Sequence, residues 1–210
     1  MARRFSALTF SPRVRAAQEK HGSARGYDKF LAPGAAAQDR LGPDEMQFIA
    51  LRDGFYQATV SETGWPYVQF RGGPRGFLKV LDDQRVAYAD FRGNRQYIST
   101  GNLAGDDRIA MILVDYPNSA RIKILGHAQI ITAQEDPELI AQLHDDDYKA
   151  RPERAVVITV EGFDWNCPQH LPVRLTMEEL QPILAPFQQE LAHLRAENAA
   201  LKAQLEGQGD

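Results

Sequence analysis

The sequence predicts a mainly β protein: an antiparallel barrel or sandwich with flanking helices. Between residues 55 and 160, short runs rich in β-branched and aromatic residues alternate with turn signals such as Thr63-Gly64 and Tyr116-Pro117-Asn118-Ser119. Helical patterns interrupt these runs at 95–103 and 137–148 and leave no strand–helix–strand rhythm, which favours antiparallel pairing. Apolar residues make up 43% of the 210 residues and charged residues 25%, as in ordinary globular proteins. We therefore expect one substantial domain with an appendage.

The first 43 residues mix basic side chains with Gly and Ala, and they are expected to form a surface wrap with short helices. Asp44 and Glu45 precede an apolar periodic run, so a helix should begin there and end before Gly54. Asp136 should likewise begin the helix at 137–148. The expected strands are 55–62, 67–71, 77–81, 85–91, 108–115, 121–132 and 155–160. The barrel domain is expected to span 44–175.

The sixth of these strands has an unusual polar face. Side chains alternate between the two faces of a strand, so its basic and polar members share one face and its apolar members share the other. The polar face is Arg121, Lys123, His127 and Gln129, and the apolar face is Ile122, Ile124, Ala128 and Ile130. Such a face is either exposed to solvent or part of a dimer interface, and both interpretations stay open.

Residues 176–210 are predicted to form one amphipathic helix. Thr176 and Glu179 have capping-box spacing. Apolar residues then follow with spacings of four and three, which predicts a parallel two-stranded coiled coil with Asn198 at a core position. Pro182 and Pro186 confine the coil to the part after Pro186. The apolar residues are Leu180, Leu184, Phe187, Leu191, Leu194, Leu201 and Leu205. The alternative is an amphipathic helix lying on its own domain, because the pattern covers less than three heptads.

Several protein classes are disfavoured. Lys and Arg total 24 against 28 Asp and Glu, a net charge of −4, which disfavours nucleic acid as a partner. Apolar runs are too short to cross a bilayer, and the N-terminus lacks the apolar core of a signal peptide. The single Cys167 has no partner for a disulfide within the chain. We expect a soluble cytoplasmic protein without membrane or nucleic-acid partners.

No metal or nucleophile motif is present. The five histidines lack metal-ligand spacing, and the glycines at 72–76 do not form a phosphate-binding Walker loop. A candidate anion site remains where the strand ending at Phe91 turns through Gly93 into a helix expected to start at Asn94 and Arg95. Free amides at a helix start attract anions, and Arg92 and Arg95 add charge. The alternative is that both arginines are solvated surface charges.

Five segments together resemble the pyridoxamine 5′-phosphate oxidase-like flavoproteins, and within them a predicted flavin-nucleotide-binding branch. The resemblance covers about residues 44–175. It rests on GWPYVQFRGG at 64–73, YADFRGNRQY at 88–97, DRIA at 107–110, RIKILG at 121–126 and DWNCPQH at 164–170.

The resemblance implies a homodimeric split β-barrel that binds FMN in a groove between two protomers. By this resemblance the phosphate would be held by Arg92, Asn94, Arg95 and Gln96. The flavin ring would lie against Tyr67, Val68, Gln69, Phe70 and Arg71, and against Ala89, Asp90 and Phe91. The partner protomer would contribute Arg121, Lys123, Trp165 and His170.

The chain also departs from the true oxidases of this family. It has Arg95-Gln96 where they have a basic pair. It has Gln69-Phe70-Arg71-Gly72-Gly73 where they have an Arg-x-Val-Leu-Leu-Lys strand. Their C-terminal Arg-Leu-x-Pro pattern is matched at best distantly, by Pro172-Val173-Arg174-Leu175. Vitamin B6 oxidation is therefore not implied.

The function predicted is flavin-dependent redox chemistry on an unknown small molecule, with no identified catalytic side chain and no metal. Three alternatives stay open. The first is a haem or deazaflavin protein, with His127 or His170 as the axial haem ligand. The second is a non-enzymatic flavin-binding module. The third is a dimeric interaction protein that uses the barrel as a scaffold.

Overall fold

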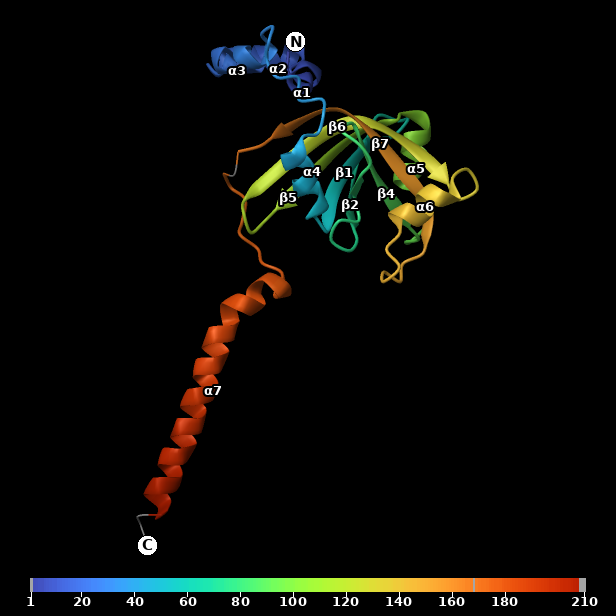
Figure 1. Ribbon diagram of the computed structural model, residues 1–210. Coiled ribbons are helices and arrows are strands. Elements are labelled where there is room, and N and C mark those ends of the chain that lie inside the picture. The colour runs from blue at the N-terminus through green and yellow to red at the C-terminus, as the bar shows by residue number, and fades with distance from the viewer. Residues whose placement is uncertain (1, 168, 208–210) are drawn as a thin grey trace. The chain divides into compact units, whose positions relative to one another are not determined.

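The computed structural model describes residues 2–167 and 169–207. The chain divides into two compact units. One, here called the barrel unit, is formed by Met1–Asp115 and Ala120–Gln169, and the other, the tail unit, by Tyr116–Ser119 and His170–Asp210. Figure 1 shows both units.

The barrel unit is built on a seven-stranded antiparallel sheet with the order β2-β1-β5-β6-β7-β4-β3. This confirms the mainly β fold with flanking helices. Each strand lies where the sequence predicts one, although β3 is shorter and β7 is longer at both ends. The strands are β1 Gly54–Val60, β2 Pro66–Gly72, β3 Lys79–Val80, β4 Arg85–Phe91, β5 Arg108–Asp115, β6 Ala120–Thr132 and β7 Pro152–Trp165.

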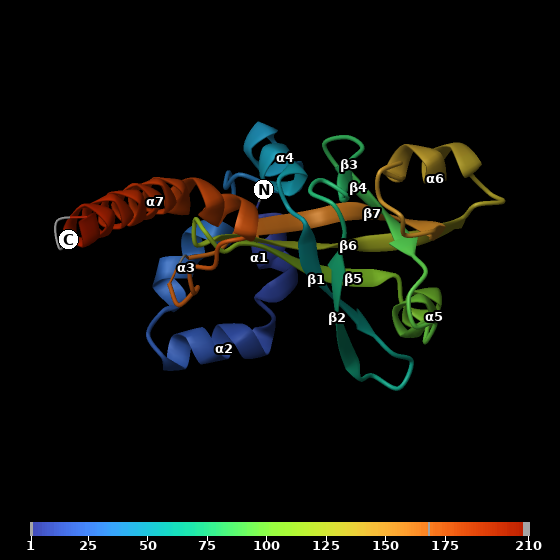
Figure 2. The same cartoon turned by 90° about the horizontal axis from the view of Figure 1, so that it is seen from below.

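The described part of the barrel unit has six helices, of which α1, α4, α5 and α6 pack on strands of the sheet, while α3 packs on α1 and α2. Those around β7 lie near its two ends: α1 packs near its C-terminal end, and α6 near its N-terminal end (Figure 2). Asp136 caps α6 as predicted, accepting a hydrogen bond from the amide of Leu139 at 2.9 Å, although α6 ends at Leu143. The helices are α1 Arg4–Thr9, α2 Pro12–Lys20, α3 Ala24–Leu31, α4 Pro43–Ala50, α5 Ile98–Gly105 and α6 Pro137–Leu143.

The barrel core is filled by alternate residues of the strands. Phe55 stacks on Phe77 with ring centroids 5.6 Å apart, and the edge of Tyr88 meets Phe55 at 5.3 Å. The Tyr88 hydroxyl donates to Gln57 Oε1 at 2.6 Å, so this buried polar group is satisfied. Each fully buried apolar side chain stabilises the fold by roughly 1.5–3 kcal/mol. Further fully buried residues are Leu113, Ile122, Ile124 and Ile158.

Two register shifts on β7 each leave one glutamate outside the ladder. Asp90 pairs with Arg154 and Phe91 with Pro152, so Glu153 is the extra residue. Leu125 pairs with Gly162 and Gly126 with Val160, so Glu161 is likewise an extra residue. A bulge re-aims its extra side chain, and Glu161 pairs with Arg4 of α1. A Cβ on Gly162 would lie 2.7 Å from the Phe5 backbone nitrogen, so this glycine permits α1 to approach.

The outer face of the sheet carries exposed apolar side chains. Val68 is 62% exposed and Phe70 57% exposed, both on β2, and Tyr56 on β1 lies opposite Phe70. The predicted alternation of β6 is confirmed, because Ile122 and Ile124 are buried while His127 is exposed.

The tail unit contains the helix α7, Met177–Gly207. The predicted capping box is confirmed: the Glu179 amide donates to Thr176 Oγ1 at 3.2 Å, and the Thr176 amide donates to Glu179 Oε2 at 2.9 Å. Helical structure continues through Pro182 and Pro186. Among the helices of the described residues, none is long and apolar enough to cross a membrane.

Candidate functional site

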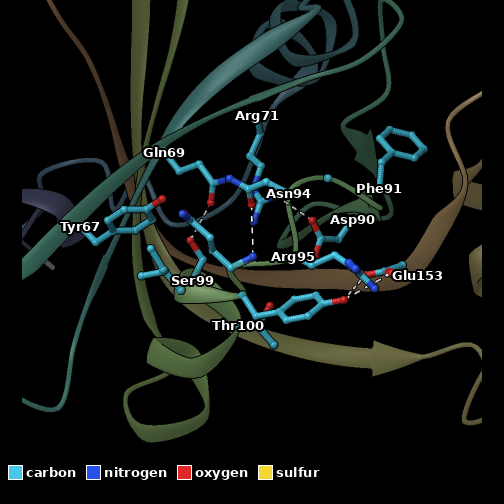
Figure 3. Close-up of a pocket in the computed structure, with 14 residues that line it drawn as sticks. Tyr67, Gln69, Arg71, Asp90, Phe91, Asn94, Arg95, Ser99, Thr100 and Glu153 are labelled. Atoms are coloured by element: carbon cyan, nitrogen blue, oxygen red, sulfur yellow. Dashed lines mark hydrogen bonds and ion pairs between the residues drawn. The ribbon is translucent and has the colours of Figure 1, made fainter.

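The sheet closes into a barrel without a ladder between its edges. Its order leaves β2 at one edge and the β4–β3 hairpin at the other. Side chains bridge this split: Arg71 Nη1 of β2 donates to Asp90 Oδ1 of β4 at 2.7 Å, and Ser99 of α5 donates to Gln69 of β2 at 3.1 Å. The candidate site lies at this split (Figure 3).

A cavity of about 270 Å³ opens here. Its walls come from β2, the end of β4, the loop and first turn of α5, and the bulge of β7. They comprise Tyr67, Gln69, Arg71, Asp90, Phe91, Gly93, Asn94, Arg95, Gln96, Tyr97, Ile98, Ser99, Thr100 and Glu153. This size is just below the usual range for small-molecule sites, so the cavity suits part of a larger ligand.

Strand alternation decides which residues of β2 enter the cavity. Tyr67, Gln69 and Arg71 are half-buried and line it, whereas Val68 and Phe70 lie on the opposite, outer face. As an edge strand among the described strands, β2 also keeps half of its backbone amides and carbonyls free of ladder partners.

The loop between β4 and α5 has an unusual backbone. Arg95 and Tyr97 both have positive φ, 60° and 53°, which is costly for residues with a side chain and is often found at functional sites. Helix α5 therefore begins at Ile98, three residues later than the sequence predicts. The expectation that Asn94 and Arg95 start the helix is wrong, because the left-handed backbone of Arg95 and Tyr97 delays the first helical turn to Ile98.

This shift changes which amides can face an anion. The first helical hydrogen bond joins the Gly101 amide to the Tyr97 carbonyl, so the amides of Ile98, Ser99 and Thr100 have no acceptor within the helix. All three residues line the cavity. Free amides and the positive end of the helix dipole favour a negative group at this place.

Ion pairs form the back wall of the cavity. Asp90 is 7% exposed and lies between Arg71 and Arg154, whose Nε is 3.4 Å from Asp90 Oδ2. Burial outweighs the attraction of these guanidinium groups and raises the pKa of Asp90. Arg154 also donates to Glu153 at 2.6 Å, and Arg92 Nε lies 3.7 Å from Glu153. Both acids are thus engaged by arginines.

The remaining donors fit an anionic ligand. Arg71 Nε is buried and, among the described residues, has no hydrogen-bond partner. Arg95, Asn94 and Gln96 are exposed at the mouth of the cavity and add a cation and amide groups. A guanidinium, amide donors and a helix start together suit a phosphate group.

The other predicted residues near the split lie in or beside a neighbouring cavity of about 240 Å³. Phe70, Ala89 and Arg92 line that cavity, which shares Arg71 and Asp90 with the first. Ala89 is buried. The structure thus sets these three residues next to the first cavity. It brings eight of the sixteen predicted residues to the first cavity itself: Tyr67, Gln69, Arg71, Asp90, Phe91, Asn94, Arg95 and Gln96.

The residues assigned to a partner protomer lie elsewhere in this chain. Lys123 Nζ donates to Asn166 at 3.1 Å, and Trp165 donates to Glu45 at 2.6 Å. Arg121 lies on β6, the same strand as Lys123, and His170 belongs to the tail unit. None of the four lines the described cavity at the split.

Sequence reasoning missed Tyr97 and Ile98, the two hydroxyl residues Ser99 and Thr100, and Glu153. The two hydroxyl residues follow the arginine loop directly, so hydroxyls beside a predicted anion site were an available signal. Glu153 had no such signal, because the bulge that turns it toward the site depends on the pairing of β7 with β4.

No metal centre is formed by the described residues. Among residues 2–167 and 169–207, no group of three or more His, Cys, Asp and Glu side chains could hold a metal ion. His127 lies on the outer face, where its Nδ1 is 2.8 Å from Asp107. It therefore does not line the cavity at the split.

These features define a split-barrel protein with a polar cavity between its sheet edges. The family model described as pyridoxamine 5′-phosphate oxidase matches residues 44–165, more than half of the chain. The chain belongs to this family, which confirms the predicted resemblance.

Solved structures with a similar fold include three bacterial proteins. HupZ of Group A Streptococcus is 18% identical, with 64% of this chain and 100% of that chain covered and a TM-score of 0.49. A putative pyridoxamine 5′-phosphate oxidase of Lactobacillus delbrueckii is 18% identical, with 60% and 94% covered and a TM-score of 0.46. An FMN-binding protein of Syntrophomonas wolfei is 12% identical, with 74% and 97% covered and a TM-score of 0.44. At these identities the likeness concerns the fold alone. No curated protein matches the chain significantly.

Proposed function

We propose that this protein is an FMN-binding flavoprotein that carries out redox chemistry on a small molecule as a homodimer. The observation that supports this most is the set of donors at the split: Arg95, Gln96 and the free amides of Ile98, Ser99 and Thr100 surround one cavity. The 5′-phosphate of FMN is an anion that such a set would hold.

The rest of the cofactor would lie along β2. Tyr67 offers an aromatic face, and Gln69 offers an amide that already bonds Ser99. Free backbone groups of the edge strand would hydrogen-bond the polar edge of the flavin ring. Bound FMN supplies electron or hydride transfer, while the protein supplies binding, orientation and charge.

The ion-pair wall would set the electrostatics of this pocket. Arg71 stands between the two cavities and is held there by Asp90, which Arg154 also contacts. Its cationic group favours negative charge on a ligand beside it. Arg71 is therefore a positioning and charge-stabilising residue in this proposal, and no acid or base is assigned.

The homodimer is supported by the outer face of the sheet. Val68 and Phe70 are more than half exposed there, and Ala58, Ala110 and Leu125 continue the apolar surface in the hollow beside them. Contiguous exposed apolar surface of this kind marks an interaction site. A second barrel covering this face would bury these apolar side chains.

The test has two parts. The purified protein should show the two visible absorption bands of oxidised flavin, or acquire them with added FMN. A Soret band would indicate haem, and a single band at shorter wavelength would indicate deazaflavin. A protein that stays colourless and ignores FMN would overturn the proposal.

The Arg95→Ala variant then locates the phosphate. Losing one charge-assisted hydrogen bond of about 1.5–3 kcal/mol should weaken FMN binding roughly 10- to 100-fold. Riboflavin, which has no phosphate, should bind both forms equally in a fluorescence titration. Arg13→Ala on the exposed side of α2 is the matched control. Unchanged FMN affinity in Arg95→Ala would place the phosphate elsewhere.

A further inference from the structure

Helix α7 carries an apolar surface that its own unit leaves uncovered. It has 31 residues and is about 46 Å long. The rest of the tail unit is the turn Tyr116–Ser119 and the short segment before Thr176, too little chain to cover such a helix. Phe187, Leu191, Leu194, Leu201 and Leu205 are between 48% and 72% exposed. This row is here called the α7 seam.

The α7 seam has the spacing of a coiled coil. With Phe187 at position d of the heptad, Leu194 and Leu201 also fall at d, while Leu191 and Leu205 fall at a. The outward positions b, c and f are mainly alanine, a strong helix former that offers no second apolar stripe of large side chains.

The charges beside the α7 seam favour a parallel second copy. Glu190 and Glu197 occupy position g, and Arg195 and Lys202 occupy position e. In a parallel pair each glutamate meets the basic residue five positions later in the partner. In an antiparallel pair glutamates would face glutamates and bases would face bases. This charge complementarity therefore indicates that the partner of α7 is α7 of a second copy, running in the same direction.

Asn198 fixes the register of such a pair. It lies between the apolar residues of the α7 seam, as the one polar residue at the a and d positions from Phe187 to Leu205. It occupies position a, where a parallel pair brings it opposite its own copy. The two amides can then hydrogen-bond, whereas a shifted register would leave each buried against leucine.

We propose that α7 forms a parallel, two-stranded coiled coil with α7 of a second copy, from Phe187 to Leu205. Pro182 and Pro186 lie inside the helix and lack the amide that continues its hydrogen bonds, so the coil begins after them. A coil of less than three heptads is weak alone. It therefore works together with the barrel contact, each raising the effective concentration of the other.

Cysteine cross-linking of the full chain tests the direction and the face of pairing. In a Cys167→Ser background, Leu201→Cys places a thiol in the seam and Ala203→Cys places one on the outward f position as the matched control. A parallel pair brings the two thiols introduced by Leu201→Cys within disulfide reach and keeps those introduced by Ala203→Cys apart. We expect Leu201→Cys to cross-link at least about tenfold faster under mild oxidation.

Each other outcome overturns the proposal. Equal cross-linking of both variants would mean that two helices are near each other without a specific face. Absence of cross-linking in both would mean that the α7 seam packs on its own chain or on a different partner, or pairs in the antiparallel direction. Circular dichroism of both variants is the control that tests whether they keep their helix. The result does not depend on flavin binding, so it is separate from the test of Arg95.

Discussion

The barrel unit and the tail unit bury apolar side chains in different ways. In the barrel unit, residues such as Phe55, Ile122 and Ile158 are at most 1% exposed, because strands distant in sequence enclose them. In the tail unit, Phe187 and Leu205 remain at least 70% exposed. The barrel core is therefore complete within one chain, whereas the α7 seam is left exposed by its own unit and in our proposal is covered by a second copy.

The largest effect should come from the ion-pair wall of the barrel. Asp90→Ala removes the acceptor shared by Arg71 and Arg154, which leaves Arg71 without its carboxylate partner and Arg154 with Glu153 alone. Breaking a buried pair from one side costs about 3–5 kcal/mol in the free energy of unfolding. Urea unfolding of the variant should show this. Asp83→Ala, which breaks the exposed pair with Arg40, is the control and should leave the midpoint unchanged.

The same carboxylate predicts a pH dependence. Burial raises the pKa of Asp90 above its ordinary 3.8. As the pH falls, the folded chain therefore binds this proton at a higher pH than the unfolded chain does. Relative to Asp90→Asn, the free energy of unfolding should therefore rise as the pH falls through the raised pKa toward 3.8, and stay level below it. An opposite slope would mean that the arginines outweigh burial.

The next largest effect concerns the tail. Asn198→Leu replaces a buried polar pair with apolar contact, so association should tighten by roughly tenfold or more and species larger than a dimer should appear. Sedimentation over a range of protein concentrations measures both. Unchanged mass and affinity would indicate that Asn198 faces water.

Truncation after Pro186 should affect the two units unequally. The barrel core contains no residue of the removed segment, so the free energy of unfolding of the barrel should change by no more than about 0.5 kcal/mol. The truncated protein should still dimerise, more weakly, and bind FMN. A monomeric, colourless product would mean that the tail assembles the dimer.

The smallest effect is expected at Cys167. This thiol is exposed, so Cys167→Ser should leave stability, FMN affinity and any later-identified turnover unchanged. A variant that binds FMN but loses turnover would assign the thiol a chemical role.

Local patterns predicted much of the fold. Runs rich in β-branched and aromatic residues, bounded by turn signals, identified all seven strands of the described sheet, and capping signals identified the starts of α4, α6 and α7. These features depend on neighbouring residues, whose spacing is visible in the chain. The positive φ of Arg95 and Tyr97 was not visible, because nothing in their side chains requires a left-handed backbone. The start of α5, and with it the set of free amides, was therefore misplaced.

By itself the sequence determined the family, the antiparallel strands, the arginine loop as a candidate anion site and the heptad spacing of α7. The tertiary structure decided which faces meet. Strand pairing placed Tyr67, Gln69 and Arg71 in the cavity and left Val68 and Phe70 outside, and the bulge of β7 turned Glu153 toward the site. The physical reason is that alternation sets which residues share a face, whereas pairing between distant segments sets what that face encloses.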